Sequence, residues 1–234
     1  KVEGENWNVK LGANVMFITG NNKKVSASPN IAADIEIADK TVLYAIATGK
    51  LYSNSMYDIS QINRYVNPTR EVTPSRNWLD AMIGLKSGVA PGFWFDVFAG
   101  YKVTNDDVLF EPSRSYYPDH FGNMSNAITN INTNRFFIGA NLKYSYQQIF
   151  DISLKGVYNS WKAKYGDKWV PSAGEELTAY GKPKMEITAG INVRPINKLN
   201  ISLDYYLATD RYTSLMGSRD IKMKNINELN LTGS

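Results

Sequence analysis

Strict alternation of apolar and other residues over segments of strand length is the feature that most constrains this chain. In residues 93–103 (FWFDVFAGYKV), every second side chain from Phe93 is apolar or aromatic, while Asp96 and Lys102 stand between them. A period of two residues is that of a β-strand with one apolar face. That face has to contact either a protein core or lipid.

The same pattern recurs in about ten segments, each near the 9–11 residues that a tilted strand needs to cross a bilayer. The clearest are residues 6–17, 30–38, 79–86, 93–103, 135–146, 150–160, 182–194 and 198–208. Two further segments are weaker, because residues 41–52 are apolar on both faces and residues 222–234 have only Leu229 and Leu231 to support them. The sequence therefore predicts an all-β chain.

The connections between these segments alternate in length. Short connections at 39–40, 87–92, 146–148 and 194–198 alternate with long loops at about 21–30, 53–77, 105–134, 162–182 and 211–222. A chain that runs up and down through a sheet places its short turns at one end and its long loops at the other, as outer-membrane barrels do. We therefore expect residues 1–234 to form an antiparallel up-and-down transmembrane β-barrel segment.

Composition narrows the function classes. No run of about 18 apolar residues is present, so a transmembrane helix is excluded. The chain has no cysteine, which removes disulfides and thiolate metal sites. The net charge of +4 is spread along the chain without a basic block, so a nucleic-acid partner is not expected.

The polar face of the strands distinguishes a membrane barrel from a soluble β-domain. In a membrane barrel this face lines the interior, and the charges predicted to face the lumen are Asp34, Glu36, Asp80, Asp96, Lys102, Lys143, Lys155, Lys184, Arg194 and Asp204. In a soluble β-sandwich or lipocalin-like barrel the polar face meets solvent, and more Lys and Glu would be expected there. A soluble sugar-binding β-domain is therefore the third-ranked alternative.

Two stretches, VAPGFWFDVFAGYKVTNDDVLF and KNINELNLTGS, resemble the later barrel strands of TonB-dependent receptor-like outer-membrane proteins, particularly those of Bacteroidota. The resemblance implies a location in the outer membrane of a Gram-negative cell. It also implies uptake of a ligand through a plugged barrel, powered by a TonB-type energy-coupling protein. We find neither a plug domain nor a final strand with a terminal aromatic residue, and such barrels have about twice as many strands. The expectation is a C-terminal barrel portion whose edges pair with the rest of a larger barrel.

Catalytic and metal sites are weakly supported. Asp119 and His120, with Asp106 and Asp107, invite comparison with ten-stranded outer-membrane proteases, but a general base needs an oriented partner and none can be assigned. The carboxylates that remain for a metal, such as Glu175 and Glu176, are adequately explained as charged loop ends. We expect no enzyme activity, no metal and no cofactor.

Aromatic residues in the expected loops are the better functional candidates. They occur beside cationic residues, a combination that suits stacking on sugar rings or contact with lipopolysaccharide phosphates. The candidates for ligand binding are Arg114, Tyr116, Tyr117, Trp161, Tyr165 and Trp169. Alternatively, these side chains pack the loops together or form an aromatic girdle in contact with outer-membrane lipid. A small non-transporting barrel, either a pore or an adhesion protein, is the second function considered.

Overall fold

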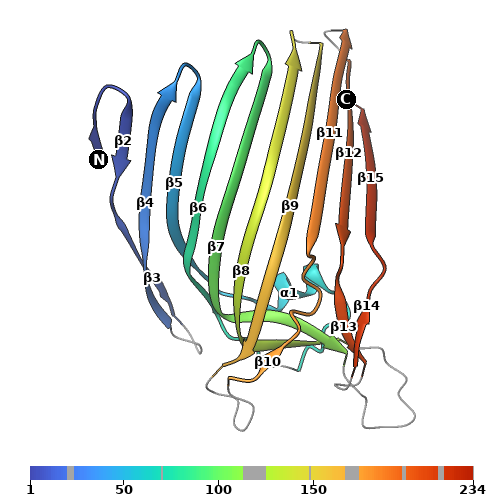
Figure 1. Ribbon diagram of the computed structural model, residues 1–234. Coiled ribbons are helices and arrows are strands. Elements are labelled where there is room, and N and C mark those ends of the chain that lie inside the picture. Colours follow the sequence, from blue (N-terminus) through green and yellow to red (C-terminus); the bar gives the residue numbers. More distant parts are fainter. Residues whose placement is uncertain are drawn as a thin grey trace.

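The computed structural model describes residues 1–19, 24–69, 71–112, 125–147, 149–166, 174–196, 199–215 and 219–233. Most of them belong to one 13-stranded antiparallel sheet, accompanied by a separate two-stranded hairpin and one short helix (Figure 1). The strand neighbours follow the order β1-β2-β4-β5-β6-β7-β8-β9-β11-β12-β15, with β3 also paired to β4 and β10 to β9. The predicted antiparallel up-and-down fold is thereby confirmed.

The strands differ widely in length. Their bounds are β1 (Val2–Glu3), β2 (Trp7–Lys10), β3 (Ala13–Ile18), β4 (Lys24–Ala38), β5 (Thr41–Tyr52), β6 (Ser75–Ala90), β7 (Phe93–Pro112), β8 (Ser125–Tyr146), β9 (Phe150–Tyr165), β10 (Glu176–Leu177), β11 (Met185–Ile196), β12 (Leu199–Thr209) and β15 (Ile226–Gly233). The separate hairpin consists of β13 (Tyr212–Leu215) and β14 (Arg219–Lys222). The first expected strand is interrupted at Leu11 and Gly12, so that β2 and β3 pair with successive parts of β4.

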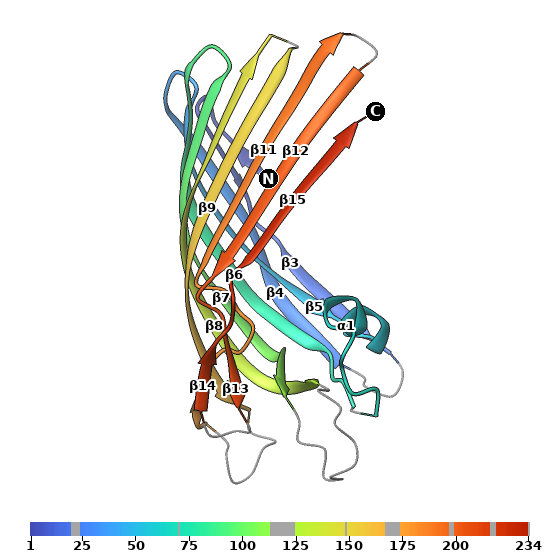
Figure 2. The same cartoon turned by 90° about the vertical axis from the view of Figure 1, so that its right-hand side faces the viewer.

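The sheet is a single curved layer that the described residues do not close (Figure 2). One edge is β15, and the other is formed by β1 and β3. The connections at residues 39–40 and 91–92 lie at the upper end of Figure 1, while α1 and the β13–β14 hairpin lie toward the lower end. We call the lower end the long-loop end.

Several strands at the long-loop end extend into ranges where the sequence predicted loops. β7 continues to Pro112 and β8 begins at Ser125, within the expected loop 105–134. Likewise, β4 begins inside 21–30, β9 runs into 162–182, and the β13–β14 hairpin occupies part of 211–222. The pattern was hidden because register shifts around Asp107 break the period of two, and because apolar residues such as Val108 and Leu109 fall on both faces of these extensions.

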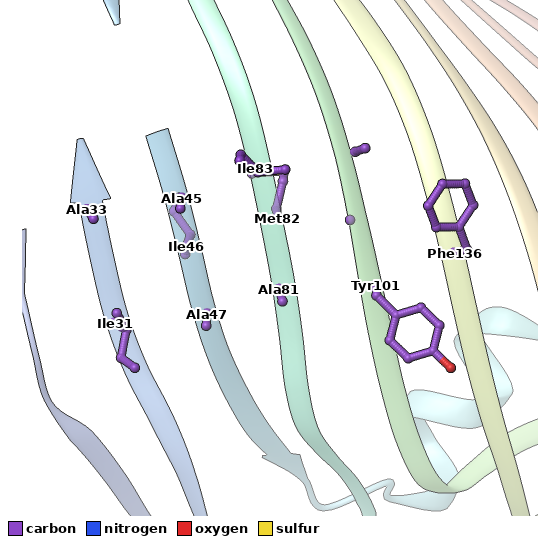
Figure 3. A pocket seen from close by; sticks show the side chains of 12 residues that line it. Ile31, Ala33, Ala45, Ile46, Ala47, Ala81, Met82, Ile83, Tyr101 and Phe136 are labelled. Carbon is purple, nitrogen blue, oxygen red and sulfur yellow. The ribbon is translucent and has the colours of Figure 1, made fainter. Parts of the chain in front are cut away.

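The two faces of the sheet differ in exposure. Apolar side chains on the convex face are open, with Ile83 54%, Val97 46% and Ile138 47% exposed, whereas Phe98 and Phe137 on the concave face are 8% and 7% exposed. Side chains converge on the concave face, where the Tyr44 hydroxyl of β5 donates to Asp96 of β7 across the intervening strand at 2.8 Å. Nothing in the described chain covers the convex face, and Figure 3 shows its apolar lining over β4 to β8.

Glycines on the concave face receive aromatic rings from the neighbouring strand. Gly139 lies opposite Phe98, and Gly100 lies opposite Phe137. A Cβ atom added at Gly139 would come within 2.6 Å of the Phe98 ring, and one added at Gly100 within 2.3 Å of the Phe137 ring. The two rings meet edge to face at 6.2 Å, so glycine at both positions is what allows this cluster to form.

The helix α1 (Met56–Ile62) lies on the inner side of the curved sheet at the long-loop end (Figure 2). It begins with a capping box, in which the Ser55 hydroxyl accepts from the Asp58 amide and the Asp58 side chain accepts from the Ser55 amide. Its buried Ile59 packs with Val66, Val108 and Phe110. In the described ranges, no helix has the length and apolarity needed to cross a membrane.

Candidate functional site

Most of the charges that the sequence assigned to the strand interior share one face of the sheet by their register, whereas Lys184 precedes β11. The ladder places Glu36, Asp96 and Lys155 in one row across β4 to β9. Further pairs occur along the same face: Lys102 with Asp80 at 3.6 Å, and Arg194 with Asp151 at 2.9 Å. Asp34 accepts from the Asn8 amide at 3.1 Å. Lys102 and Asp80 are directly opposed on adjacent strands, as are Asn8 and Asp34, whereas Asp151 lies opposite Asn192 and so meets Arg194 diagonally.

A hydrogen-bonded polar cluster on this face centres on Arg135, Asn159 and Glu186. The Arg135 guanidinium donates to the Asn159 side-chain oxygen at 2.8 Å, and the Asn159 amide donates to Glu186 at 3.0 Å. The Tyr206 hydroxyl donates to the other Glu186 oxygen at 3.0 Å. Asn159 is fully buried, so these bonds satisfy polar groups that water cannot reach. Sequence reasoning placed Arg135 on the polar face without selecting it as a site residue.

Trp161 joins this cluster to the long-loop end. Its indole nitrogen donates to the Pro183 carbonyl at 3.0 Å. The Arg135 guanidinium lies 5.3 Å and the Lys182 ammonium 5.5 Å from the centre of the indole ring. These contacts hold the ring in one orientation and place two cations against it.

Next to Trp161 is a pocket of about 470 Å³. It is lined by Trp161, Glu176, Leu177, Thr178, Ala179, Lys182, Lys184, Asp210, Tyr212 and Asp220. These residues come from β9, β10, the segment leading into β11, the residue that follows β12 and the β13–β14 hairpin, which meet at the long-loop end (Figure 1). Its volume is within the range of small-molecule sites. We call it the β10 pocket.

Hydrogen bonds and ion pairs fix the polar lining of the β10 pocket. Both the Thr178 and the Tyr180 hydroxyls donate to the Asp220 carboxylate, the latter at 2.9 Å. Lys182 pairs with Asp107 at 3.3 Å, and Lys222 pairs with Asp210 at 2.5 Å. The hydrogen bond from Lys222, followed by that from Thr209, lowers the pKa of Asp210 from its ordinary value. The Lys184 ammonium lies 5.5 Å from the centre of the Tyr212 ring.

Only two of the six ligand-binding candidates predicted from the sequence lie in the described ranges. Trp161 and Tyr165 belong to β9, so their predicted place in a loop is wrong. Trp161 lines the β10 pocket, whereas Tyr165 packs against the cluster of Leu109, Ile131 and Ala163. Arg114, Tyr116, Tyr117 and Trp169 lie outside the described residues, as does His120. A ligand-binding role for these residues stays a prediction.

Sequence reasoning missed Tyr212, Asp220 and most of the pocket lining. These residues are far from Trp161 in sequence, and only the antiparallel order β9-β11-β12 brings their segments together. The described ranges contain no group of three His, Cys, Asp or Glu residues positioned to hold a metal ion. The chemistry offered by the β10 pocket is therefore hydrogen bonding, charge and aromatic contact.

Comparison with known proteins identifies the fold. No family model matches the chain, and no curated protein matches it. Among solved structures, the copper transporter OprC superposes with a TM-score of 0.56 at 12% identity, covering 98% of this chain and 38% of that one. The pyoverdine outer membrane receptor FpvA from Pseudomonas aeruginosa PAO1 gives 0.59 at 11% identity, covering 98% and 33%.

A third similar structure is BauA, the ferric preacinetobactin receptor from Acinetobacter baumannii, with a TM-score of 0.58 at 15% identity, covering 97% of this chain and 33% of that one. The chain thus spans about a third of the length of these proteins. At such low identity the likeness concerns the fold alone. The sheet has the fold of part of the barrel of TonB-dependent outer-membrane receptors.

Proposed function

We propose that this chain is part of an outer-membrane barrel that takes up a ligand, in the manner of a TonB-dependent receptor. The observation that carries the proposal is the contrast between the two faces of a single-layer sheet. The convex face exposes Ile83, Val97 and Ile138 without any covering layer, while charges on the concave face pair with one another. Exposed apolar area of this extent is expected where a surface contacts lipid.

The open edges support the same proposal. Among the described strands β15 pairs with β12 alone, and in lipid its unpaired backbone groups would be costly. Further strands of a larger barrel would satisfy them, and the concave charges would face its lumen or a plug. The sequence resemblance also favours a TonB-type energy-coupling partner and a receptor of the Bacteroidota type. The convex face would contact outer-membrane lipid, including lipopolysaccharide.

A non-transporting pore or adhesion barrel is the alternative. It would have the same two faces but would not depend on energy from the inner membrane. A soluble sugar-binding domain is disfavoured, because it would leave the convex apolar row in water. Enzyme activity is not proposed, since transport and recognition account for the arrangement without a catalytic group.

The test is membrane fractionation followed by an uptake assay. The protein should be found in the outer membrane, require detergent for extraction, and migrate faster on a gel before heating than after it. Deletion of the energy-coupling protein should abolish accumulation of the ligand that the barrel takes up. Recovery as a stable monomer without detergent would refute the barrel, and uptake that persists without the coupling protein would favour the passive pore.

A further inference from the structure

Another pocket lies at the opposite end of the sheet from the β10 pocket. It has a volume of about 300 Å³ and is lined by Lys86, Trp94, Phe95, Asp96, Asn141 and Lys143. These residues belong to β6, β7 and β8, next to the connection at 91–92 at the upper end of Figure 1. We call it the short-turn pocket. Its volume is at the lower end of the range of small-molecule sites.

Among the described residues, the two ammonium groups of the short-turn pocket have no ion-pair partner. Lys86 is directly opposite Asp96 in the ladder, yet the ion pairs of the described chain include neither Lys86 nor Lys143. The Asp96 carboxylate accepts instead from the Tyr44 hydroxyl of β5 at 2.8 Å. Two ammonium groups against one carboxylate leave the lining with a net charge of +1.

The indole ring of Trp94 forms an apolar wall between these cations. The ring lies over Gly88, where an added Cβ atom would come within 2.9 Å of it. The Lys86 ammonium is 5.8 Å from the centre of the ring, and Lys143 is directly opposite Trp94 on β8. Directly opposed side chains on adjacent strands are neighbours, so a group that contacts the ring also lies near both ammonium groups.

The charge of the lining restricts what the pocket can bind. A cationic ligand would meet two ammonium groups, and a dianion would exceed the net charge of the lining while also meeting Asp96; both are costly. A single carboxylate has two oxygens, so it can accept one hydrogen bond from each lysine, and such charge-assisted bonds are about twice as strong as neutral ones. Asp151, which lies diagonally from Lys143 on β9, is already bonded to Arg194 at 2.9 Å.

We infer that the short-turn pocket is a binding site for a single carboxylate group, bonded by Lys86 and Lys143, whose attached carbon atoms contact the Trp94 ring. The carboxylate comes either from a small organic acid or from an Asp or Glu side chain of a polypeptide segment that enters at this end; the recognition chemistry is the same. The inference goes beyond the proposed function, because carboxylate binding here requires neither uptake nor an energy-coupling protein.

The first measurement distinguishes the two sources. The protein extracted from outer membranes in detergent is treated with a water-soluble carbodiimide, which joins an amine to a neighbouring carboxylate as an amide and takes up the lost water as its urea. If a polypeptide segment occupies the pocket, peptide mass spectrometry should find Lys86 or Lys143 linked to a carboxylate other than Asp96. If no such link forms, titration calorimetry should show that benzoate binds more tightly than benzamide, its neutral counterpart, and than phthalate, a dianion.

Two variants and a control test the role of the lysines. Lys86→Gln and Lys143→Gln should each lower the benzoate affinity, or the cross-link yield at the other lysine, about tenfold, the effect of losing one hydrogen bond to a charged group. Lys50→Gln is the matched control, because the Lys50 ammonium is likewise near an aromatic ring, 5.1 Å from the centre of Tyr52, but is not part of the pocket lining. All three variants should stay heat-modifiable, as a folded barrel is.

The inference is overturned if neither a cross-link nor benzoate binding is found, if benzamide or phthalate binds as tightly as benzoate, or if Lys50→Gln has the effect of the two pocket variants. Ligand uptake by a protein whose short-turn pocket binds no carboxylate would remove this inference alone. Carboxylate binding by a protein found outside the outer membrane would remove the proposed function alone.

Discussion

Arginine substitutions on the two faces of β11 test which face of the sheet contacts lipid and which is polar. Ile187 and Thr188 are neighbours in the chain and therefore lie at nearly the same depth. Ile187 is opposite Gly156 and Leu207 in the convex row, whereas Thr188 is opposite Lys155 and Tyr206 in the concave row. Ile187→Arg puts the guanidinium into the proposed lipid, and Thr188→Arg puts the same group among charged and hydroxyl side chains.

The expected loss in the free energy of unfolding depends on how deep in the bilayer the substituted residue lies. An arginine on the lipid face of a barrel costs about 2–4 kcal/mol at the bilayer midplane and about 0–1 kcal/mol near the interface. Ile187 lies one alternate position from the centre of the convex row of β11, so we expect Ile187→Arg to lower the free energy of unfolding by about 2–3 kcal/mol. That corresponds to a factor of roughly 30–150 in the folded-to-unfolded ratio.

The assay is urea unfolding of the protein from lipid vesicles, together with the fraction assembled in outer membranes as judged by heat-modifiability. Thr188→Arg should change stability by under about 1 kcal/mol, as expected of a substitution exposed to water. Equal stability of the two variants would refute the assignment of faces, and a larger loss for Thr188→Arg would reverse it.

Three further predictions concern packing, polar contacts and the loop helix. Gly139→Ala should destabilise the sheet by about 1–3 kcal/mol because its new methyl group meets a phenyl ring, while Gly156→Ala, with no atom within 4 Å of its Cβ position, should be neutral or stabilising in the same urea assay. Asn159→Ala should cost about 1–3 kcal/mol, since it leaves buried polar partners unpaired; an unchanged unfolding midpoint would contradict this. Ser55→Ala should weaken α1 by about 1 kcal/mol and speed amide exchange there, whereas Ser60→Ala should not; equal exchange in both variants would show that the cap is dispensable.

The apolar band of each strand could be predicted from the sequence because its period of two is imposed by the contrast between two environments. Where β7 and β8 extend beyond that band, apolar residues such as Val108 and Leu109 follow one another along the strand and therefore fall on both faces, so the alternation is lost. Their pairing from Pro112 with Ser125 back to Asp107 with Ile131 consequently could not be distinguished from a loop. The weak segment 41–52 formed β5 nonetheless, because backbone pairing with β4 and β6 supplies what its pattern lacked.

The candidate site was less predictable than the fold. Trp161 was selected from the sequence for its place beside cations, and the structure does put Lys182 and Arg135 against its ring. Its neighbours Tyr212 and Asp220 are brought near it only by the strand order. Such contacts between distant segments leave no local signal in a single sequence, which is why the β10 pocket was found from the structure.

The paired glycines and rings on β7 and β8 have a consequence for strand alignment. A slip of one residue would exchange the two faces of a strand, and the apolar pattern opposes it. A slip of two residues keeps every side chain on its face, so the apolar alternation does not oppose it. Sliding β8 by two positions would move Phe137 and Gly139 away from Gly100 and Phe98, forcing a ring against a residue with a side chain. The glycines therefore select a single register of β7 against β8 among those that the apolar pattern allows.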